Sequence, residues 1–230
     1  MKPPRSAFTQ REWQVVQRYR TPYQVQQYLN AMPYNDESSG PSLRSFRGVV
    51  KTGTAHCLEA AITAAVILEQ HGYPPTFLDL NSKDLLDHVM FLYRDPEGLW
   101  GTVARSRDPG LHGRKPVFKT LRALVDSYFE PYIDYEGRIV GYGVGDLRDL
   151  RGCDWRLSAW NVWKVERYFV EMDHRPFHGS DRRYQHWYER YCAYKRRFPD
   201  RKPLYYANRR SWTAGYPKGL TTGSKPGTSP

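Results

Sequence analysis

The chain has 230 residues, a length that suits one substantial hydrophobic core. Hydrophobic residues make up 40% of the sequence and aromatic residues 15%, which indicates a packed globular protein and excludes a wholly disordered one. The formal net charge is +11, and residues 180–212 carry +7 of it, because they hold ten Lys/Arg against three Asp/Glu. The positive charge is therefore concentrated in one region near the C-terminal end.

The cysteine content argues against a disulfide scaffold. The three cysteines, Cys57, Cys153 and Cys192, are odd in number and show no CxxC spacing, so a structural zinc site is not expected either. The N-terminal residues lack the apolar run of a signal peptide, and no segment approaches the ~20 apolar residues of a membrane span. These features predict a cytoplasmic protein in a reduced compartment, with no membrane association, no cofactor and no metal.

The first half of the chain predicts helices separated by a turn-rich segment. Residues 9–32 have apolar residues at helical spacing and indicate one or two helices. Residues 33–50 are rich in turn formers and predict a loop. An almost wholly apolar helix is expected over residues 54–71, with Thr54 as its N-cap and Gly72 just after its end.

The period then changes from that of helices to that of strands. Residues 76–80 and 88–93 predict strands, and residues 99–104 predict a third that pairs with the second through the turn at 95–98. No helix separates these strands, so the sheet is expected to be antiparallel and the fold class α+β.

The second half predicts further helices. Residues 121–132, 156–172 and 181–198 show apolar residues at helical spacing. Glycines at 137, 141, 143 and 145 predict a loop, and they do not form a dinucleotide-binding fingerprint because no strand-turn-helix unit surrounds them.

We expect one domain over residues 1–212. Its core covers about 20–135, and a helical C-terminal extension covers about 154–200. Residues 213–230 consist mainly of Gly, Thr, Ser, Pro and Lys and are predicted to be disordered.

Cys57 lies in the first turn of the apolar helix, where a thiolate would be stabilised. Unpaired N–H groups and the helix dipole favour negative charge at a helix N-terminus and lower the pKa of a thiol there. This placement predicts a nucleophile that reacts with iodoacetamide at neutral pH faster than Cys153 and Cys192. His88, at the start of a predicted strand, is the candidate base that takes the thiol proton.

Three motifs carry a resemblance to a known family. Gly53-x-x-x-Cys57 opens an apolar helix, and Asp87-His88-Val89 and Trp100-Gly101-Thr102-Val103 follow it. Together they resemble the transglutaminase-like superfamily, and the similarity covers roughly residues 20–135. Within that superfamily, Ala55 to Ala60, Asp79-Leu80, Asp87-His88-Val89 and the segment Trp100 to Ser106 resemble a group of bacterial transglutaminase-like proteins without settled function.

The resemblance implies a fold and a class of reaction. The fold is an α+β core like that of papain, in which a central helix carrying the cysteine packs on an antiparallel sheet. The activity is hydrolysis of an amide bond or acyl transfer, with a protein or peptide as substrate.

One position departs from the family pattern. The pattern places an aspartate four residues after the strand tryptophan, where this chain has Ala104, which cannot orient an imidazole. Ser106 or Asp108 is expected to take that role by reaching around the strand end; alternatively, Cys57 and His88 act as a dyad.

Other ionisable residues near the motifs have structural interpretations. His56 adjoins Cys57 in sequence, but neighbouring helical residues do not face one another. Glu59 is expected to pair with a basic loop residue inside the core. His174 and His178 have a spacing seen in metal sites, but Pro176 prevents the helix that would align them.

The basic, aromatic helix predicted at 181–198 has two interpretations. Its aromatic residues pack on the core while its arginines are solvated, or the arginines contact phosphate while tyrosines stack on bases. The alternative to an enzyme is accordingly a catalytically inactive module that binds nucleic acid or an acidic protein through residues 180–212.

Overall fold

The computed structural model of the protein describes residues 2–203 and 208–213. The strands are β1 (Thr76–Ser82), β2 (His88–Arg94), β3 (Trp100–Val103), β4 (Ile139–Asp146) and β5 (Arg175–Pro176). The helices are α1 (Gln10–Arg18), α2 (Pro22–Ala31), α3 (Phe46–Thr52), α4 (Cys57–Gln70), α5 (Leu121–Asp126), α6 (Phe129–Tyr132), α7 (Trp163–Glu171), α8 (Asp181–Arg197) and α9 (Arg209–Trp212). Two short 3-10 helices, η1 (Arg5–Ala7) and η2 (Pro109–Leu111), complete the described elements.

The strands form one antiparallel sheet in the order β3-β2-β1-β4-β5. The α+β class and the predicted β2–β3 hairpin are therefore confirmed. In the register of β1 with β2, Leu80 lies opposite His88 and Asp79 lies opposite Val89. Because directly opposed residues share a face of the sheet, Asp79 and Val89 lie on one face and His88 on the other.

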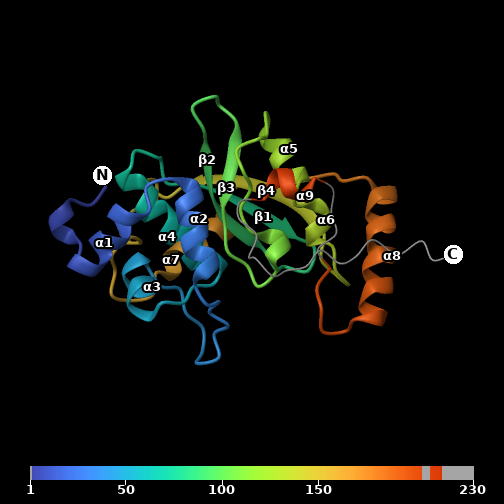
Figure 1. Ribbon diagram of the computed structural model, residues 1–230, viewed down its shortest axis with the longest axis horizontal. Helices are drawn as coiled ribbons and strands as arrows, with labels where there is room; N and C mark the ends of the chain where they lie inside the picture. The colour runs from blue at the N-terminus through green and yellow to red at the C-terminus, as the bar shows by residue number, and fades with distance from the viewer. Residues whose placement is uncertain (1, 204–207, 214–230) are drawn as a thin grey trace.

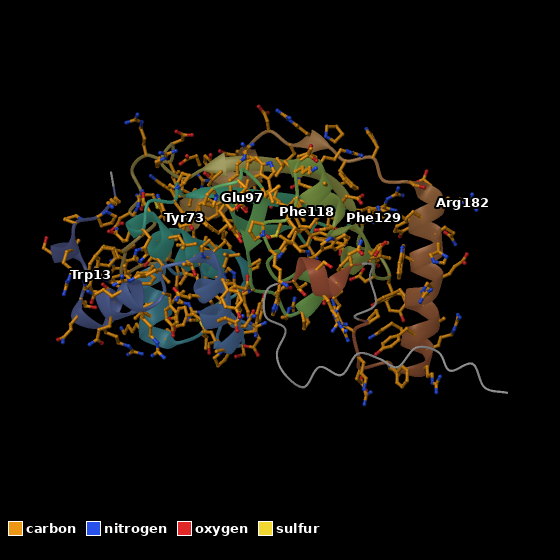
Figure 2. All side chains as sticks on the ribbon, turned by 45° about the horizontal axis from the view of Figure 1, so that its top comes forward. Trp13, Tyr73, Glu97, Phe118, Phe129 and Arg182 are labelled. Atoms are coloured by element: carbon orange, nitrogen blue, oxygen red, sulfur yellow. The ribbon has the colours of Figure 1, made fainter. Side chains whose placement is uncertain are left out.

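The sheet separates two hydrophobic cores (Figure 1). One face, which carries Phe77 and Val89, packs against α4, with α1, α2, α3 and α7 around it. The other face, which carries Leu80 and Met90, packs against the segment of α5 and α6 and against aromatic residues of α8. Figure 2 shows Phe118 and Phe129 on the α8 side of the sheet and Trp13 at the opposite end of the molecule.

Helix α4 is buried almost throughout, as its sequence predicts, since Leu58 to Glu69 are all buried. Its start differs from the prediction. The N-cap is His56, whose backbone N–H donates to Glu59 Oε2 at 3.0 Å, so Cys57 is the first helical residue. The hydroxyl of Thr54, the predicted cap, instead accepts a hydrogen bond from Arg44. The predicted stop is confirmed, because Gly72 adopts a φ of 93° just after the helix.

The glycine-rich segment predicted as a loop is strand β4, and this prediction was wrong. A Cβ at Gly143 would lie 2.4 Å from Met172 Cε, and one at Gly145 would lie 2.8 Å from the ring of Tyr168. These glycines therefore allow the chain from α7 to β5 to pack directly on the strand. The sheet consequently extends past residue 135, where the predicted core ended.

Several helix boundaries also differ from the predictions. Helix α3 lies within the predicted loop 33–50, and the predicted helix 121–132 divides into α5 and α6 at Ser127. The predicted helix 156–172 begins only at Trp163. The predicted disorder of residues 213–230 lies outside the described residues, apart from Thr213. In the described part of the chain, none of the helices has the length and apolarity needed to cross a membrane.

Candidate active site

All four residues predicted for the site line one cavity of about 700 Å³. Cys57 reaches it from the start of α4 and His88 from the start of β2, while Ser106 and Asp108 reach it from the segment after β3. The β1–β2 turn, residues 83–87, contributes a further part of the wall. The fold thus brings these four residues together around one cavity.

The Cys57 thiol is held by backbone groups, but its pKa is not lowered. Burial raises the pKa of Cys57 to about 11, and the nearby carboxylate of Asp79 raises it further. The backbone N–H groups of Leu58 and Val89 face the sulfur and act in the opposite direction without overcoming burial. The expectation of a thiolate in the resting protein was therefore wrong, because removal from water outweighs the helix terminus.

His88 is held in one tautomer by a backbone carbonyl. Its Nε2 lies 2.8 Å from the carbonyl oxygen of Leu111, and because a carbonyl only accepts, Nε2 must carry the proton. The neutral ring therefore has its lone pair on Nδ1. Burial lowers the pKa of His88 to about 4, and the charge of Arg114 lowers it further, so the ring is neutral at pH 7.

The imidazole is oriented by Leu111, not by Ser106 or Asp108 as predicted. Asp108 Oδ1 accepts from Gly110 N at 2.8 Å and its Oδ2 lies 3.4 Å from Lys202 Nζ, while Ser106 Oγ accepts from the backbone N–H of Asp108. Asp108 is thereby the N-cap of η2, the short helix that ends at Leu111. These two residues shape the turn that presents the carbonyl to His88.

Sulfur and imidazole enter the cavity from different faces of the sheet. Cys57 lies against the face of Val89, and the His88 ring lies near Tyr128, with ring centroids 6.5 Å apart, on the other face. Both side chains reach the cavity next to the first residues of β2, at the end of the strand that borders the cavity. The prediction that His88 takes the thiol proton implies that the two side chains share a face of the sheet, and the structure differs from it.

A second pair of ionisable residues, not predicted from the sequence, lies beside Cys57. Asp79 Oδ2 lies 3.0 Å from His174 Nε2, and His174 Nδ1 lies 2.9 Å from the carbonyl oxygen of Met172. Since Nδ1 must donate to that carbonyl, the contact between Nε2 and Oδ2 holds one further proton. Burial raises the pKa of Asp79 to about 6, against the lowering effect of His174.

The loop in front of α4 is fixed by the predicted ion pair of Glu59. Both carboxylate oxygens of this fully buried residue bind the guanidinium of Arg44, at 2.7 and 2.8 Å. Glu59 also accepts from the side chain of Asn35 and, as noted, from the backbone of His56. The pair therefore fixes residues 35–44 against the helix end that carries Cys57.

The comparisons with known proteins give distant structural similarity. No family model matches the sequence, and no curated protein matches it. Among solved structures, LapG of Legionella pneumophila has 16% sequence identity and a TM-score of 0.37, over 61% of this chain and 80% of that one. Its calcium-bound form has 14% identity and a TM-score of 0.36, over 70% of this chain and 87% of that one. At these values the likeness assigns neither a family nor an activity.

Proposed function

We propose that this protein is a transglutaminase-like cysteine hydrolase or acyltransferase that acts on an amide bond of a protein or peptide. Cys57 is the nucleophile and His88 the base. The observation that supports this best is the His88–Leu111 contact, because it fixes the proton on Nε2 and the lone pair on Nδ1 of a histidine that lines the same cavity as Cys57. The papain-like core that the motifs imply would place the cysteine on a buried helix, as α4 does.

The resting protonation states determine how the first step proceeds. Both groups are neutral, because the pKa of Cys57 is raised and that of His88 is lowered. We infer that the thiol proton moves to Nδ1 at the cavity end of β2, where the two side chains arrive from opposite faces of the sheet, as the sulfur attacks the substrate carbonyl carbon and forms a C–S bond. The N–H groups of Leu58 and Val89 lie near the sulfur and are the candidate donors to the oxyanion.

The second half of the reaction returns the proton. The C–N bond breaks as Nδ1–H of His88 protonates the leaving amine, which leaves a thioester on Cys57. Water or an amine then attacks the thioester carbonyl and gives up a proton to His88, which passes it to the departing sulfur. Hydrolysis and acyl transfer share these steps and differ in the second nucleophile, which is water in hydrolysis and an amine in acyl transfer.

An acylation experiment tests this function without knowledge of the substrate. The protein is incubated with p-nitrophenyl acetate, and the acylated residue is located by peptide mass spectrometry. We expect acetylation of Cys57 as a hydroxylamine-sensitive thioester, slowed about 100-fold or more in His88→Gln, which is the usual contribution of a general base. Cys153→Ala is the matched control and should acylate at the wild-type rate. Equal acylation of all three cysteines, or no effect of His88→Gln, would count against the proposal.

The exposed face of α8 supports a second candidate function, the binding of a polyanion. Tyr191 is the one buried residue of this helix, while Arg182, Arg190, Arg196 and Arg197 are exposed. Figure 2 shows Arg182 at the end of α8, at the edge of the molecule. Such a face predicts salt-sensitive binding of nucleic acid or an acidic protein that survives Cys57→Ala. Failure of the protein to bind immobilised heparin at low salt would remove this candidate.

A further inference from the structure

The cavity around Cys57 is acidic, although the protein as a whole is strongly basic. Among the described residues that line it, eight are Asp or Glu and two are Arg or Lys, whereas the chain carries a net charge of +11. An enclosed surface of one sign concentrates counter-ions of the other sign. The wall next to the nucleophile therefore favours a cation.

Ion pairs neutralise only part of this negative charge. Asp108 lies 3.4 Å from Lys202, and Glu130 lies 3.2 Å from Arg183. The other six acidic residues of the wall form no ion pair with Arg or Lys in the part of the chain that the structure describes. They are Glu37, Asp79, Asp84, Asp87, Asp134 and Glu166.

Asp79 adds an observation that is independent of this charge count. The residue is 2% exposed; His174 contacts Oδ2, and Oδ1 has no hydrogen-bond partner among the described residues. A buried carboxylate oxygen without a donor is destabilising, and native proteins rarely contain one. Since Asp79 lines the cavity, a donor group of a bound ligand can fill this position.

We propose that the amide substrate carries a basic side chain, of lysine or arginine type, whose cation donates to Asp79 Oδ1 beside Cys57. This inference rests on the proposed function and names its substrate class. The carboxylates around Asp79 draw the cation into the cavity, and His174 holds the Asp79 side chain in place through Oδ2. The long methylene chain of lysine or arginine allows the charged group to reach a buried carboxylate such as that of Asp79.

The rest of the wall favours an organic cation over a metal ion. No group of three or more His, Cys, Asp or Glu residues in the described chain is arranged to hold a metal. The wall also contains apolar side chains, and Leu85 and Leu86, at the β1–β2 turn, are 84% and 63% exposed. Apolar contacts next to a buried charge match a peptide residue with a hydrocarbon stem.

Binding of matched peptides to the Cys57→Ala protein tests this inference without turnover. Fluorescent peptides of one sequence carry lysine, arginine, norleucine or glutamate at a single position, and affinity is measured by anisotropy. We expect the lysine and arginine peptides to bind at least tenfold more tightly than the norleucine peptide, and the glutamate peptide to bind most weakly. Equal affinities for lysine and norleucine would overturn the inference.

Asp79→Asn in the same background assigns the preference to this carboxylate. The amide of asparagine can still hydrogen-bond His174, so the wall keeps its shape while it loses the charge. The preference for lysine should fall to about twofold or less, whereas Asp200→Asn, outside the cavity, should leave it unchanged. A preference that survives Asp79→Asn would overturn the inference, as would displacement of the lysine peptide by calcium chloride but not by sodium chloride of equal ionic strength.

The two proposals fail in different ways. Binding with a lysine preference, but no acylation of Cys57 in the wild-type protein, would refute the proposed function and leave the cation site. Acylation of Cys57 with His88 dependence, but no charge preference in binding, would refute the cation site and leave the function.

Discussion

Gly143 of β4 lies directly opposite Asp79 of β1, and the missing side chain at residue 143 leaves the space in which His174 reaches the Asp79 carboxylate. A Cβ at this position would lie 2.9 Å from Asp173 O and 3.1 Å from His174 Cδ2. The glycine is therefore a requirement of the Asp79–His174 pair and not only of the strand.

Gly143→Ala is expected to displace His174 from Asp79. The added methyl group forces Met172 and residues 173–174 away from the sheet, and such overpacking costs typically 1–3 kcal/mol. Urea unfolding measures the loss of stability, and the peptide-binding assay measures the loss of lysine preference. Gly141→Ala is the matched control in the same strand, because its Cβ would meet its nearest neighbour at an ordinary 3.4 Å. Equal effects of the two substitutions would contradict the assignment.

The raised pKa of Asp79 predicts that Asp79→Asn stabilises the protein at neutral pH. The folded state binds this proton with a pKa of about 6, above the ordinary value of 3.8, so the charged carboxylate destabilises the fold increasingly as pH rises from 3.8 through 6. Removal of the charge should add on the order of 1–3 kcal/mol at pH 7.5 and almost nothing at pH 4. Urea unfolding at both pH values checks this. A variant less stable than wild type at pH 7.5 would show that the carboxylate is structural.

The lowered pKa values of His88 and His112 predict that the protein loses stability as the pH falls, which is opposite to the effect of Asp79. Burial lowers both to about 4, whereas an unfolded histidine titrates near 6.5. The unfolded state therefore binds more protons between pH 6.5 and 4, and stability present above pH 6.5 is lost across that range. Each histidine contributes on the order of 3 kcal/mol to this loss. His88→Gln should remove about half of it in unfolding experiments from pH 7 to pH 4; an unchanged profile would exclude His88 as a cause.

Alkylation of Cys57 should show no plateau near neutral pH. With a pKa of about 11, the thiolate fraction and the rate of reaction with iodoacetamide should rise about tenfold per pH unit from pH 7.5 to 9.5. Peptide mapping after timed quenching gives the rate for this cysteine alone. A rate that levels off below pH 8.5 would mean that the pKa of Cys57 is lowered and that the helix terminus outweighs burial.

Glu59→Gln should strongly destabilise the protein and loosen the start of α4. Arg44 would be left without a charged partner for its half-buried guanidinium, and breaking one side of a buried pair typically costs 3–5 kcal/mol. Thermal and urea unfolding measure this loss. The control is Arg148→Gln, which breaks the exposed pair with Asp146 and should cost less than about 1 kcal/mol. Similar losses in the two variants would contradict a special role of Glu59.

Short sequence patterns predicted the helices and strands whose formation depends on residues close to one another in the chain. The apolar helix, its stop at Gly72 and the β2–β3 hairpin follow from hydrophobic period and turn residues, and they place Cys57 and His88 on the right elements. Strand β4 could not be predicted in this way. Its alternate glycines offer no hydrophobic signal, and its extended form depends on pairing with β1 and on the close packing of residues 168–174.

Only the site residues that stand in a recognisable motif, or that form an expected ion pair, were predictable from the sequence. Cys57 and His88 stand in recognisable motifs, and Glu59 pairs with a basic loop residue as expected. The Asp79–His174 pair joins residues 95 apart in sequence, and no short pattern connects them. The pKa of Cys57 was predicted in the wrong direction because the sequence gives the helix terminus but not the depth of burial around it.

The use of the Leu111 carbonyl as the partner of His88 has a consequence for how such a site evolves. Every residue type has a backbone carbonyl oxygen, so a substitution at position 111 that keeps the backbone conformation changes the side chain while the imidazole keeps its acceptor. What selection must preserve instead is the shape of the 3-10 turn, through Asp108 and Gly110. Related chains with this arrangement would show, in their sequences, no acidic side chain at the position where the family pattern has its aspartate.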